Sequence, residues 1–108
     1  MNEAYEVVWA SVAEYDLLEI LVYIAEENPE NALDILKRIK SRTDKLEQSP
    51  MQGRVVPELL GQGISSYREL VVGPWRVIYK VEQKSVHIVS VMDSRRKVED
   101  VLLARLLR

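Results

Sequence analysis

The distribution of hydrophobic and polar positions divides the chain into a helical first half and a strand-rich second half. Residues 5–9 are apolar and β-prone, so a short strand is expected there. Over residues 12–27 apolar side chains recur at helical spacing. Ser11, with Glu14 three positions later, is typical of a capping box at the helix start. The stripe expected to face the core comprises Val12, Tyr15, Leu18, Val22 and Ala25, widened by Leu17, Leu21 and Ile24.

A second helix is predicted to follow after a short break. Asn28 can cap its start, and Pro29 suits the first turn because the missing N–H would have no partner there anyway. Ser49-Pro50 should end it. Its apolar positions are Leu33, Leu36, Ile39, Thr43 and Leu46. The two helices therefore form a hairpin.

Beyond residue 50 the pattern is that of strands. Strands are expected at 67–72, 75–81 and 86–92, with a further edge strand possible at 55–58. Gly73-Pro74 and residues 82–85 should form the turns. Asp93-Ser94 can cap a final helix at 95–107. The prediction is one α+β domain spanning residues 1–108: an N-terminal strand, a helical hairpin, a three- to four-stranded antiparallel sheet and a C-terminal helix, with the helices on one sheet face.

The alternation within the strands assigns side chains to two faces. A four-residue turn would pair Val81 with Val86, which places six apolar side chains on a core face: Trp75, Val77, Tyr79, Val81, Val86 and Ile88. The other face mixes cations with apolar groups and is expected to bind a partner: Arg76, Ile78, Lys80, His87, Val89, Val91 and Asp93. The face of Arg68 depends on the length of the Gly73-Pro74 turn and stays open.

Composition excludes several kinds of site. The 108 residues contain no cysteine and one histidine, which excludes disulfides, thiolate metal sites, a cysteine nucleophile and a multi-histidine zinc site. No metal and no cofactor is therefore expected. The net charge of −2 hides an asymmetry, with eleven acidic and five basic residues in 1–53, and six acidic and ten basic in 54–108. A basic second half suits an acidic partner, although an ordinary solvated surface explains it equally well.

The chain shows no membrane or export signal. Its most apolar run, residues 17–25, is interrupted by Glu19 and is shorter than the roughly 20 residues of a membrane span. The first five residues have no basic region and no long apolar stretch. A cytoplasmic location without membrane contact is expected.

Several segments, in order, resemble the RelE/ParE superfamily of type II toxin–antitoxin toxins, which includes plasmid stabilisation proteins. Residues 67–80 and 86–96 resemble the sheet and its exit, and residues 16–25 and 28–32 resemble the first helix and the helical turn. Ser49-Pro50 followed by Gly53-Arg54 resembles the approach to the sheet. The resemblance implies this fold, growth inhibition, a cognate ParD-like or similar antitoxin, and a homodimer or a toxin–antitoxin hetero-oligomer.

The resemblance also implies one of two targets. RelE-like members cut messenger RNA on the ribosome, whereas ParE-like members are associated with inhibition of DNA gyrase. RNA cleavage needs an acid, a base and cations for the phosphate. Four residues could supply these groups: Arg68, Arg76, His87 and Arg95.

The proton-transfer positions fit the nuclease branch poorly. Leu70 stands where a second strand lysine would be, Val101-Leu102 where a tyrosine would be, and Asp93 where many members have histidine. The prediction is a non-enzymatic, ParE-like toxin. The alternatives are a ribosome-dependent endoribonuclease and a degenerate toxin that only binds antitoxin.

The expected surface for target and antitoxin combines one sheet face with the last helix. It comprises Arg68, Arg76, Lys80, His87, Asp93, Arg95 and Arg96, together with Leu103 and Leu107. Structural alternatives compete with this role: Arg76 could pair with Asp93 or Glu69, and His87 could be a half-exposed strand residue. Charge reversal at Arg76 is expected to weaken toxicity or antitoxin affinity.

Overall fold

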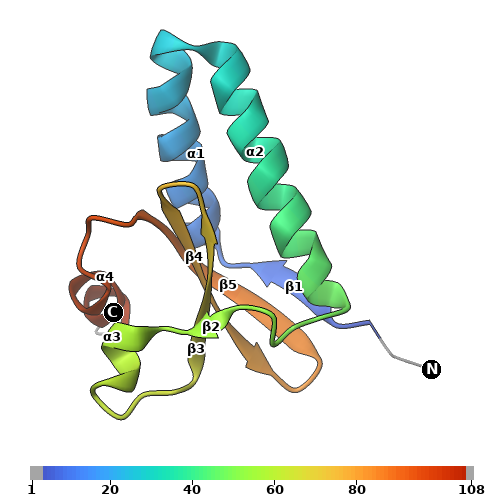
Figure 1. The fold of residues 1–108 in the computed structure, drawn as a ribbon, viewed down its shortest axis with the longest axis vertical. Helices are drawn as coiled ribbons and strands as arrows, with labels where there is room; N and C mark the ends of the chain where they lie inside the picture. Colours follow the sequence, from blue (N-terminus) through green and yellow to red (C-terminus); the bar gives the residue numbers. More distant parts are fainter. Residues whose placement is uncertain (1–3, 107–108) are drawn as a thin grey trace.

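A computed structural model describes residues 4–106 of the chain, with the side chains of residues 4–105 (Figure 1). It is the expected α+β domain, with two long helices standing over a twisted sheet. The elements in order are β1 (Glu6–Trp9), α1 (Ser11–Glu27), α2 (Pro29–Asp44), the 3-10 turn η1 (Lys45–Glu47), β2 (Arg54–Val55), α3 (Pro57–Leu60), β3 (Tyr67–Val72), β4 (Trp75–Glu82), β5 (Ser85–Asp93) and α4 (Val98–Leu106).

The sheet has five strands in the order β1-β5-β4-β3-β2. Strands β2 to β5 are antiparallel neighbours, as predicted, and β1 adds a parallel edge beside β5. Val7 lies opposite Val86 in this pair. The chain can return parallel to β1 only because the hairpin and the other strands intervene in sequence.

The helix starts test the predicted caps. The Asn28 side chain accepts a hydrogen bond from the Asn31 N–H at 3.0 Å, so that cap is confirmed. The Ser11 capping box is wrong: Ala10 is the cap and Ser11 already lies in the first turn. The Ala10 N–H donates to the Ile88 carbonyl at 3.0 Å, while its own carbonyl accepts from Ala13 and Glu14. Pairing with β5 therefore decides where the strand ends and the helix begins.

The last helix begins at Val98 rather than at residue 95. The Asp93 side chain accepts from the Arg95 N–H at 2.8 Å, and the Asp93 carbonyl accepts from the Arg96 N–H at 3.0 Å. These two bonds form a turn at Asp93. The residue predicted to cap the helix therefore holds this turn, and the helix begins after it.

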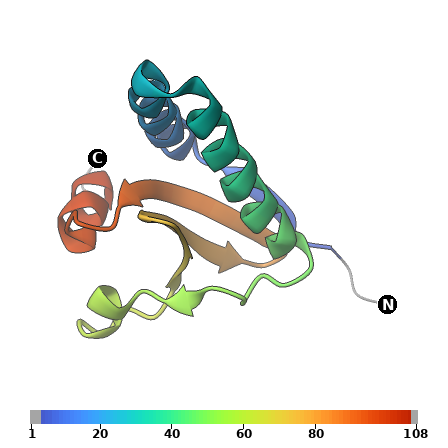
Figure 2. The ribbon, with the colours of Figure 1, turned by 45° about the horizontal axis from the view of Figure 1, so that its top comes forward.

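Helices cover both faces of the sheet, which corrects the expected one-sided arrangement (Figure 2). Helices α1 and α2 pack over a core formed by Ala13, Ile35, Ile39, Leu46, Leu70, Val72, Val77, Tyr79, Val86, Ile88 and Val91. Helices α3 and α4 enclose a second core formed by Val56, Leu59, Ile78, Met92, Val98, Val101 and Leu102. The face predicted to bind a partner is therefore partly covered by the chain itself.

A β-bulge in β5 changes the side-chain alternation. Tyr79 pairs with Ile88 as predicted, but Ile78 pairs with Ser90, which leaves Val89 as the extra residue. Beyond the bulge Val91 lies opposite Val77 and Asp93 opposite Trp75. Val91 and Asp93 therefore do not share the face of Arg76, contrary to the prediction, and Met92 takes that place.

The turn between β3 and β4 settles the face of Arg68. Val72 pairs with Trp75, so Gly73 and Pro74 form a two-residue turn. Gly73 has φ +58, a conformation that favours glycine. Arg68 consequently lies opposite Tyr79, on the face covered by α1 and α2, whereas Arg76 lies on the opposite face.

Gly53 lets the chain pass closely over the sheet before β2. Its N–H donates to the Tyr79 hydroxyl at 2.8 Å, which satisfies a buried phenol. A Cβ at this position would lie 2.5 Å from the Glu69 carbonyl oxygen, so only glycine fits without movement.

Among residues 4–106, none of the helices has the length and apolar character needed to cross a bilayer.

Candidate functional site

Arg76 lies at the centre of a buried ionic network. It is 6% exposed. Its Nη1 and Nη2 atoms donate to the two carboxylate oxygens of Glu58 at 2.6 and 2.8 Å, and its Nε donates to Glu69. Glu69 is fully buried and also accepts from Arg54 Nε at 2.7 Å. The network joins α3, the β2 edge and two central strands.

This network neutralises the guanidinium. The hydrogen bonds from Arg76 lower the pKa of Glu58 to about 2, and the same carboxylate, followed by Glu69, raises the pKa of Arg76 above its already high value. Two carboxylates thus balance two cations, Arg76 and Arg54. The sequence offered Glu69 or Asp93 as a structural partner for Arg76. The structure pairs Arg76 with Glu69, and Asp93 takes no part in the network. An incoming phosphate would have to compete with two carboxylates that already occupy the Nε, Nη1 and Nη2 atoms of Arg76.

We expect acid to weaken the fold through Glu58. The pKa of Glu58 is about 2 in the folded chain against an ordinary value of 4.5. The unfolded chain therefore takes up this proton first, and the stabilisation that is complete above pH 4.5 is lost as the pH falls to about 2.

Urea unfolding followed by circular dichroism between pH 7 and pH 2.5 measures this contribution. The Glu58→Gln variant should lose less stability over the interval than the parent. Glu27→Gln, at the exposed end of α1, changes the net charge equally and should behave as the parent. An equal acid loss in Glu58→Gln and the parent would contradict the role of this carboxylate.

Arg68 supports the loop before β2. Its Nη1 donates to the Gly53 carbonyl at 2.7 Å and weakly to the Met51 carbonyl at 3.4 Å. Because Arg68 and Arg76 occupy opposite faces of the sheet, they cannot hold one phosphate together.

His87 lies far along the sheet from Arg76. It lies opposite Lys80 on β4, and Lys80 is four strand positions from Arg76, a distance of about 13 Å. The Lys80 Nζ atom forms an ion pair with Glu82 Oε1 at 2.6 Å, and this hydrogen bond raises the pKa of the lysine. The four candidate nuclease residues therefore do not converge on one position.

The segment between β5 and α4 carries the most exposed of the predicted cations. The Arg95 side chain is 88% exposed, and its Nε and Nη2 donate to Asp93 at 3.0 and 2.9 Å. These bonds lower the pKa of Asp93. Arg96 is exposed, and no ion pair involves it within the described part of the chain.

Helix α4 turns most of its apolar residues inward. Val98, Val101 and Leu102 are buried, whereas Leu103 is exposed; Leu107 lies outside the described residues. Arg105 ties the helix to the rest of the fold, because its Nη2 meets Asp16 Oδ1 at 2.7 Å. Its Nη1 also donates to the Val89 carbonyl at the bulge, at 2.9 Å.

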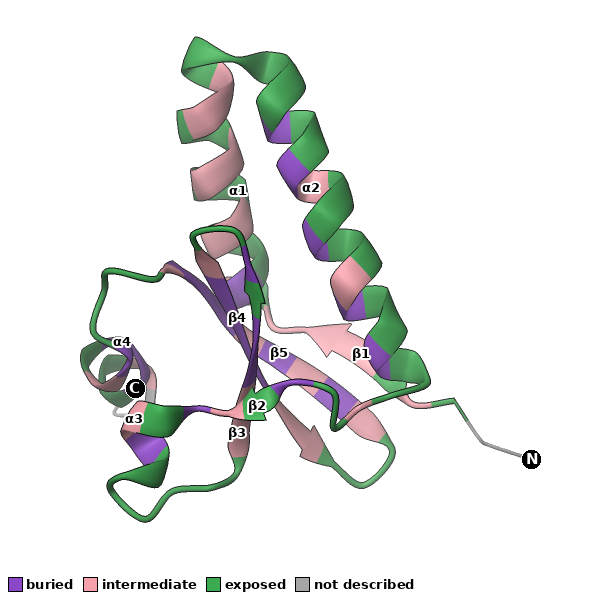
Figure 3. Ribbon diagram, in the orientation of Figure 1, coloured by how far each residue is buried: buried purple, intermediate pink, exposed green. Residues whose placement is uncertain are grey.

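Helix α1 has exposed positions along its length (Figure 3), and several of them are apolar side chains that the periodicity assigns to the core. Its exposed side chains, named here the α1 surface, are Tyr15, Leu18, Val22 and Tyr23. Contacts with the core come from Leu17, Leu21 and Ile24, which the prediction placed at the edge of the stripe, and from Ile20, which it did not include. The helix is apolar around most of its circumference, so periodicity alone did not show which side meets the sheet. A cluster of exposed apolar groups on one helix is typical of a binding surface.

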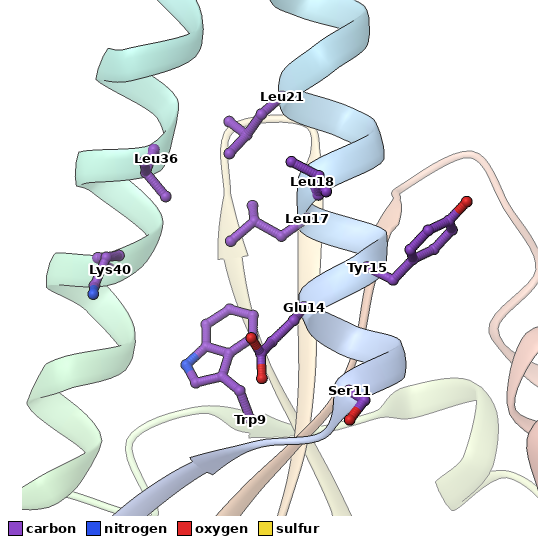
Figure 4. A pocket seen from close by; sticks show the side chains of 9 residues that line it. All are labelled: Trp9, Ser11, Glu14, Tyr15, Leu17, Leu18, Leu21, Leu36 and Lys40. Carbon is purple, nitrogen blue, oxygen red and sulfur yellow. The ribbon is translucent and has the colours of Figure 1, made fainter.

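A groove of about 660 Å³ runs between α1 and α2 beside the α1 surface. In Figure 4, Leu17 and Leu21 point from α1 toward Leu36 of α2, and the Trp9 indole lies between the helices. Glu14 stands on the α1 side and Lys40 on the α2 side. A second hollow along α1 is bordered by Glu19 and Glu26. The apolar floor with charged borders fits an amphipathic segment.

Within residues 4–105 no three or more histidine, cysteine, aspartate or glutamate side chains gather as metal ligands would.

Two solved structures of toxin–antitoxin systems have a similar fold. The chain matches a structure of the chromosomal ParDE toxin–antitoxin system from P. aeruginosa with a TM-score of 0.67 and 23% identity, over 85% of this chain and 98% of that one. It matches the RelBE2 toxin–antitoxin complex from Mycobacterium tuberculosis with a TM-score of 0.56 and 17% identity, over 86% and 94% of the two chains.

Sequence comparison defines the family. Residues 7–98 match the family described as ParE toxin of type II toxin–antitoxin system, parDE. The chain is also 37% identical over 92 residues to toxin RelE2 of Caulobacter vibrioides, covering 84% of this chain and 97% of the relative. The chain therefore belongs to the ParE toxin family of type II toxin–antitoxin systems.

Proposed function

We propose that this ParE-family toxin inhibits growth by binding DNA gyrase without catalysing a reaction, and that a cognate antitoxin neutralises it. The observation that carries this proposal is the state of Arg76. The strand cation that a nuclease would direct at phosphate is buried and paired with Glu58 and Glu69.

The remaining nuclease candidates add support. Arg68 lies on the opposite sheet face, and His87 is several strand positions away from Arg76. A proton donor, a proton acceptor and a phosphate-binding cation must surround one phosphodiester for RNA cleavage. Binding without catalysis requires no such convergence.

The segment that leads into α4 is the proposed contact for gyrase. Arg95 and Arg96 are exposed there, and Leu103 follows on the outer side of α4. Exposed arginines next to an apolar side chain match the composition of protein interfaces, where arginine is enriched.

The α1 surface and the adjacent groove are the proposed antitoxin contact. The solved neighbours from P. aeruginosa and M. tuberculosis are described as a toxin–antitoxin system and a toxin–antitoxin complex. The apolar side chains here are bordered by Glu14, Glu19 and Glu26. Such a border favours an antitoxin segment whose apolar face is flanked by lysine or arginine, and it disfavours a second copy of α1 on the same surface.

The target is tested by inducing the chain in a bacterium while plasmid supercoiling and RNA 5′ ends are measured in parallel. We expect growth arrest with altered supercoiling and no codon-positioned RNA cuts. In a purified gyrase assay, Arg95→Gln/Arg96→Gln should relieve the inhibition, whereas Lys40→Gln/Lys45→Gln, with the same charge change on α2 and η1, should not.

Two outcomes would contradict the proposal. Codon-positioned cuts with normal supercoiling would identify a ribosome-dependent endoribonuclease. Tight antitoxin binding without any effect on growth would identify a degenerate toxin.

A further inference from the structure

The side of α2 next to the β3–β4 turn carries an unusual concentration of cations. A hollow of about 270 Å³ is lined by Lys37, Arg38, Ser41, Arg42 and Val72, here called the α2 basic hollow. No acidic side chain lines it. Within residues 4–105, none of its three cations lies within 4.0 Å of a carboxylate oxygen in an ion pair.

The geometry of the helix creates this cluster. Positions 37, 38, 41 and 42 fall on adjacent corners of one helical face, because residues four apart are neighbours. Residues on the other side of α2 are buried, among them Ile35 and Ile39. The Arg42 Nη1 atom donates to the Val71 carbonyl at 3.3 Å, which holds this guanidinium near the turn. The Arg38 guanidinium lies over Gly73, 3.8 Å from where a Cβ would be.

Helix electrostatics alone do not account for the cluster. Cations near the C-terminal end of a helix are favourable, which explains basic residues in this half of α2. That effect does not depend on the side of the helix. Arg38 and Arg42 lie four residues apart, where like charges repel each other. Asp34 and Asp44 lie on the same helix but do not line the hollow. The cations are therefore gathered on one side at an electrostatic cost.

We infer that the α2 basic hollow binds neighbouring phosphate groups of a nucleic acid backbone, independently of base sequence. Three cations and the Ser41 hydroxyl can all donate to phosphate oxygens, and Val72 is the single apolar side chain in the lining. Protein–protein interfaces have an apolar centre and little lysine, whereas protein–nucleic acid interfaces are polar and strongly positive. The composition of the hollow therefore favours a nucleic acid over an acidic protein segment.

This site goes beyond the proposed function and does not depend on it. It lies on α2, whereas the proposed gyrase contact lies in the segment between β5 and α4 (Figure 1). A toxin that acts on any nucleic-acid-bound machine could use it as a second, sequence-independent contact.

The inference is tested by fluorescence anisotropy with a labelled 20-base-pair DNA duplex at 25 to 200 mM KCl. We expect weak binding. The logarithm of the association constant should fall with the logarithm of the salt concentration with a slope of about −3, because each neutralised phosphate contributes roughly −0.9 to the slope. The Lys37→Gln/Arg38→Gln variant should bind about tenfold more weakly and lose about 2 from the slope. Lys40→Gln/Lys45→Gln, with the same charge change on α2 and at its C-cap, should stay within about twofold of the parent.

A second variant, Ser41→Asp, places a carboxylate in the hollow and should also weaken DNA binding. Circular dichroism checks that each variant is folded. No duplex binding by the parent at 25 mM KCl would overturn the inference. An equal loss of DNA affinity in the two double variants would show that net charge alone causes the binding, which would also overturn the inference. Displacement of the duplex by poly-glutamate at lower concentration than by unlabelled DNA would identify an acidic protein segment instead.

Discussion

Replacing Arg76 with leucine is expected to lower the free energy of unfolding by about 3–5 kcal/mol, the usual cost of removing one partner of a buried ion pair. Glu69 is 1% exposed and would lose its buried cation, and Glu58 would lose a bidentate partner. Urea unfolding followed by circular dichroism measures the change. The earlier expectation for Arg76→Glu, weaker toxicity or affinity, now has a different cause: a third carboxylate would enter the network and the fold would loosen.

The control for this prediction is Arg95→Leu. That arginine pairs with Asp93 at the surface, where a salt bridge contributes about 0–1 kcal/mol, so little change is expected. The double variant Arg76→Leu/Glu69→Leu should recover part of the loss, because it leaves no unpaired charge at the buried end of the network. A loss below about 1 kcal/mol in Arg76→Leu would show that the network is not a main stabilising feature.

Replacing Leu18 with arginine is expected to weaken antitoxin binding by at least about 2 kcal/mol, roughly 30-fold in Kd, while the fold is kept. Leu18 is 56% exposed in the chain alone, and it lies where the α1 surface meets the groove. The arginine removes an apolar contact and repels the cations proposed to flank the antitoxin segment. Titration calorimetry with the cognate antitoxin, together with rescue of growth in cells, measures the effect.

Leu33→Arg is a matched control for this experiment. Leu33 is also 56% exposed, but it lies on α2 and lines neither the groove nor the hollow along α1. The control should bind antitoxin within about twofold of the parent. Equal weakening in the two variants, or none in Leu18→Arg, would show that the antitoxin binds elsewhere, with the outer side of α4 around Leu103 as the next surface to test.

Local signals in the sequence determined most of the secondary structure. The helical hairpin, the Asn28 cap, the three long strands and the pairing of Tyr79 with Ile88 all follow from residues within one element or one turn. The ordered motifs across the chain also identified the superfamily, because they depend on residue identity rather than on packing.

Tertiary structure decided what each face of these elements contacts. Pairing with β5 places the N-cap of α1 at Ala10 instead of Ser11, and the bulge at Val89 moves Val91 and Asp93 away from the face of Arg76. A bulge reverses the alternation by one residue, and nothing in a strand's own pattern marks it.

The candidate site shows the same division. The sequence by itself determined which charged and apolar residues are present and on which element each lies. Whether Arg76 is a free cation was decided by Glu58, which is 18 residues away and is brought to it by α3. Whether Leu18 is core or surface was decided by the side of α1 that rests on the sheet. A side chain's role depends on partners distant in sequence, and periodicity reports only the spacing within one element.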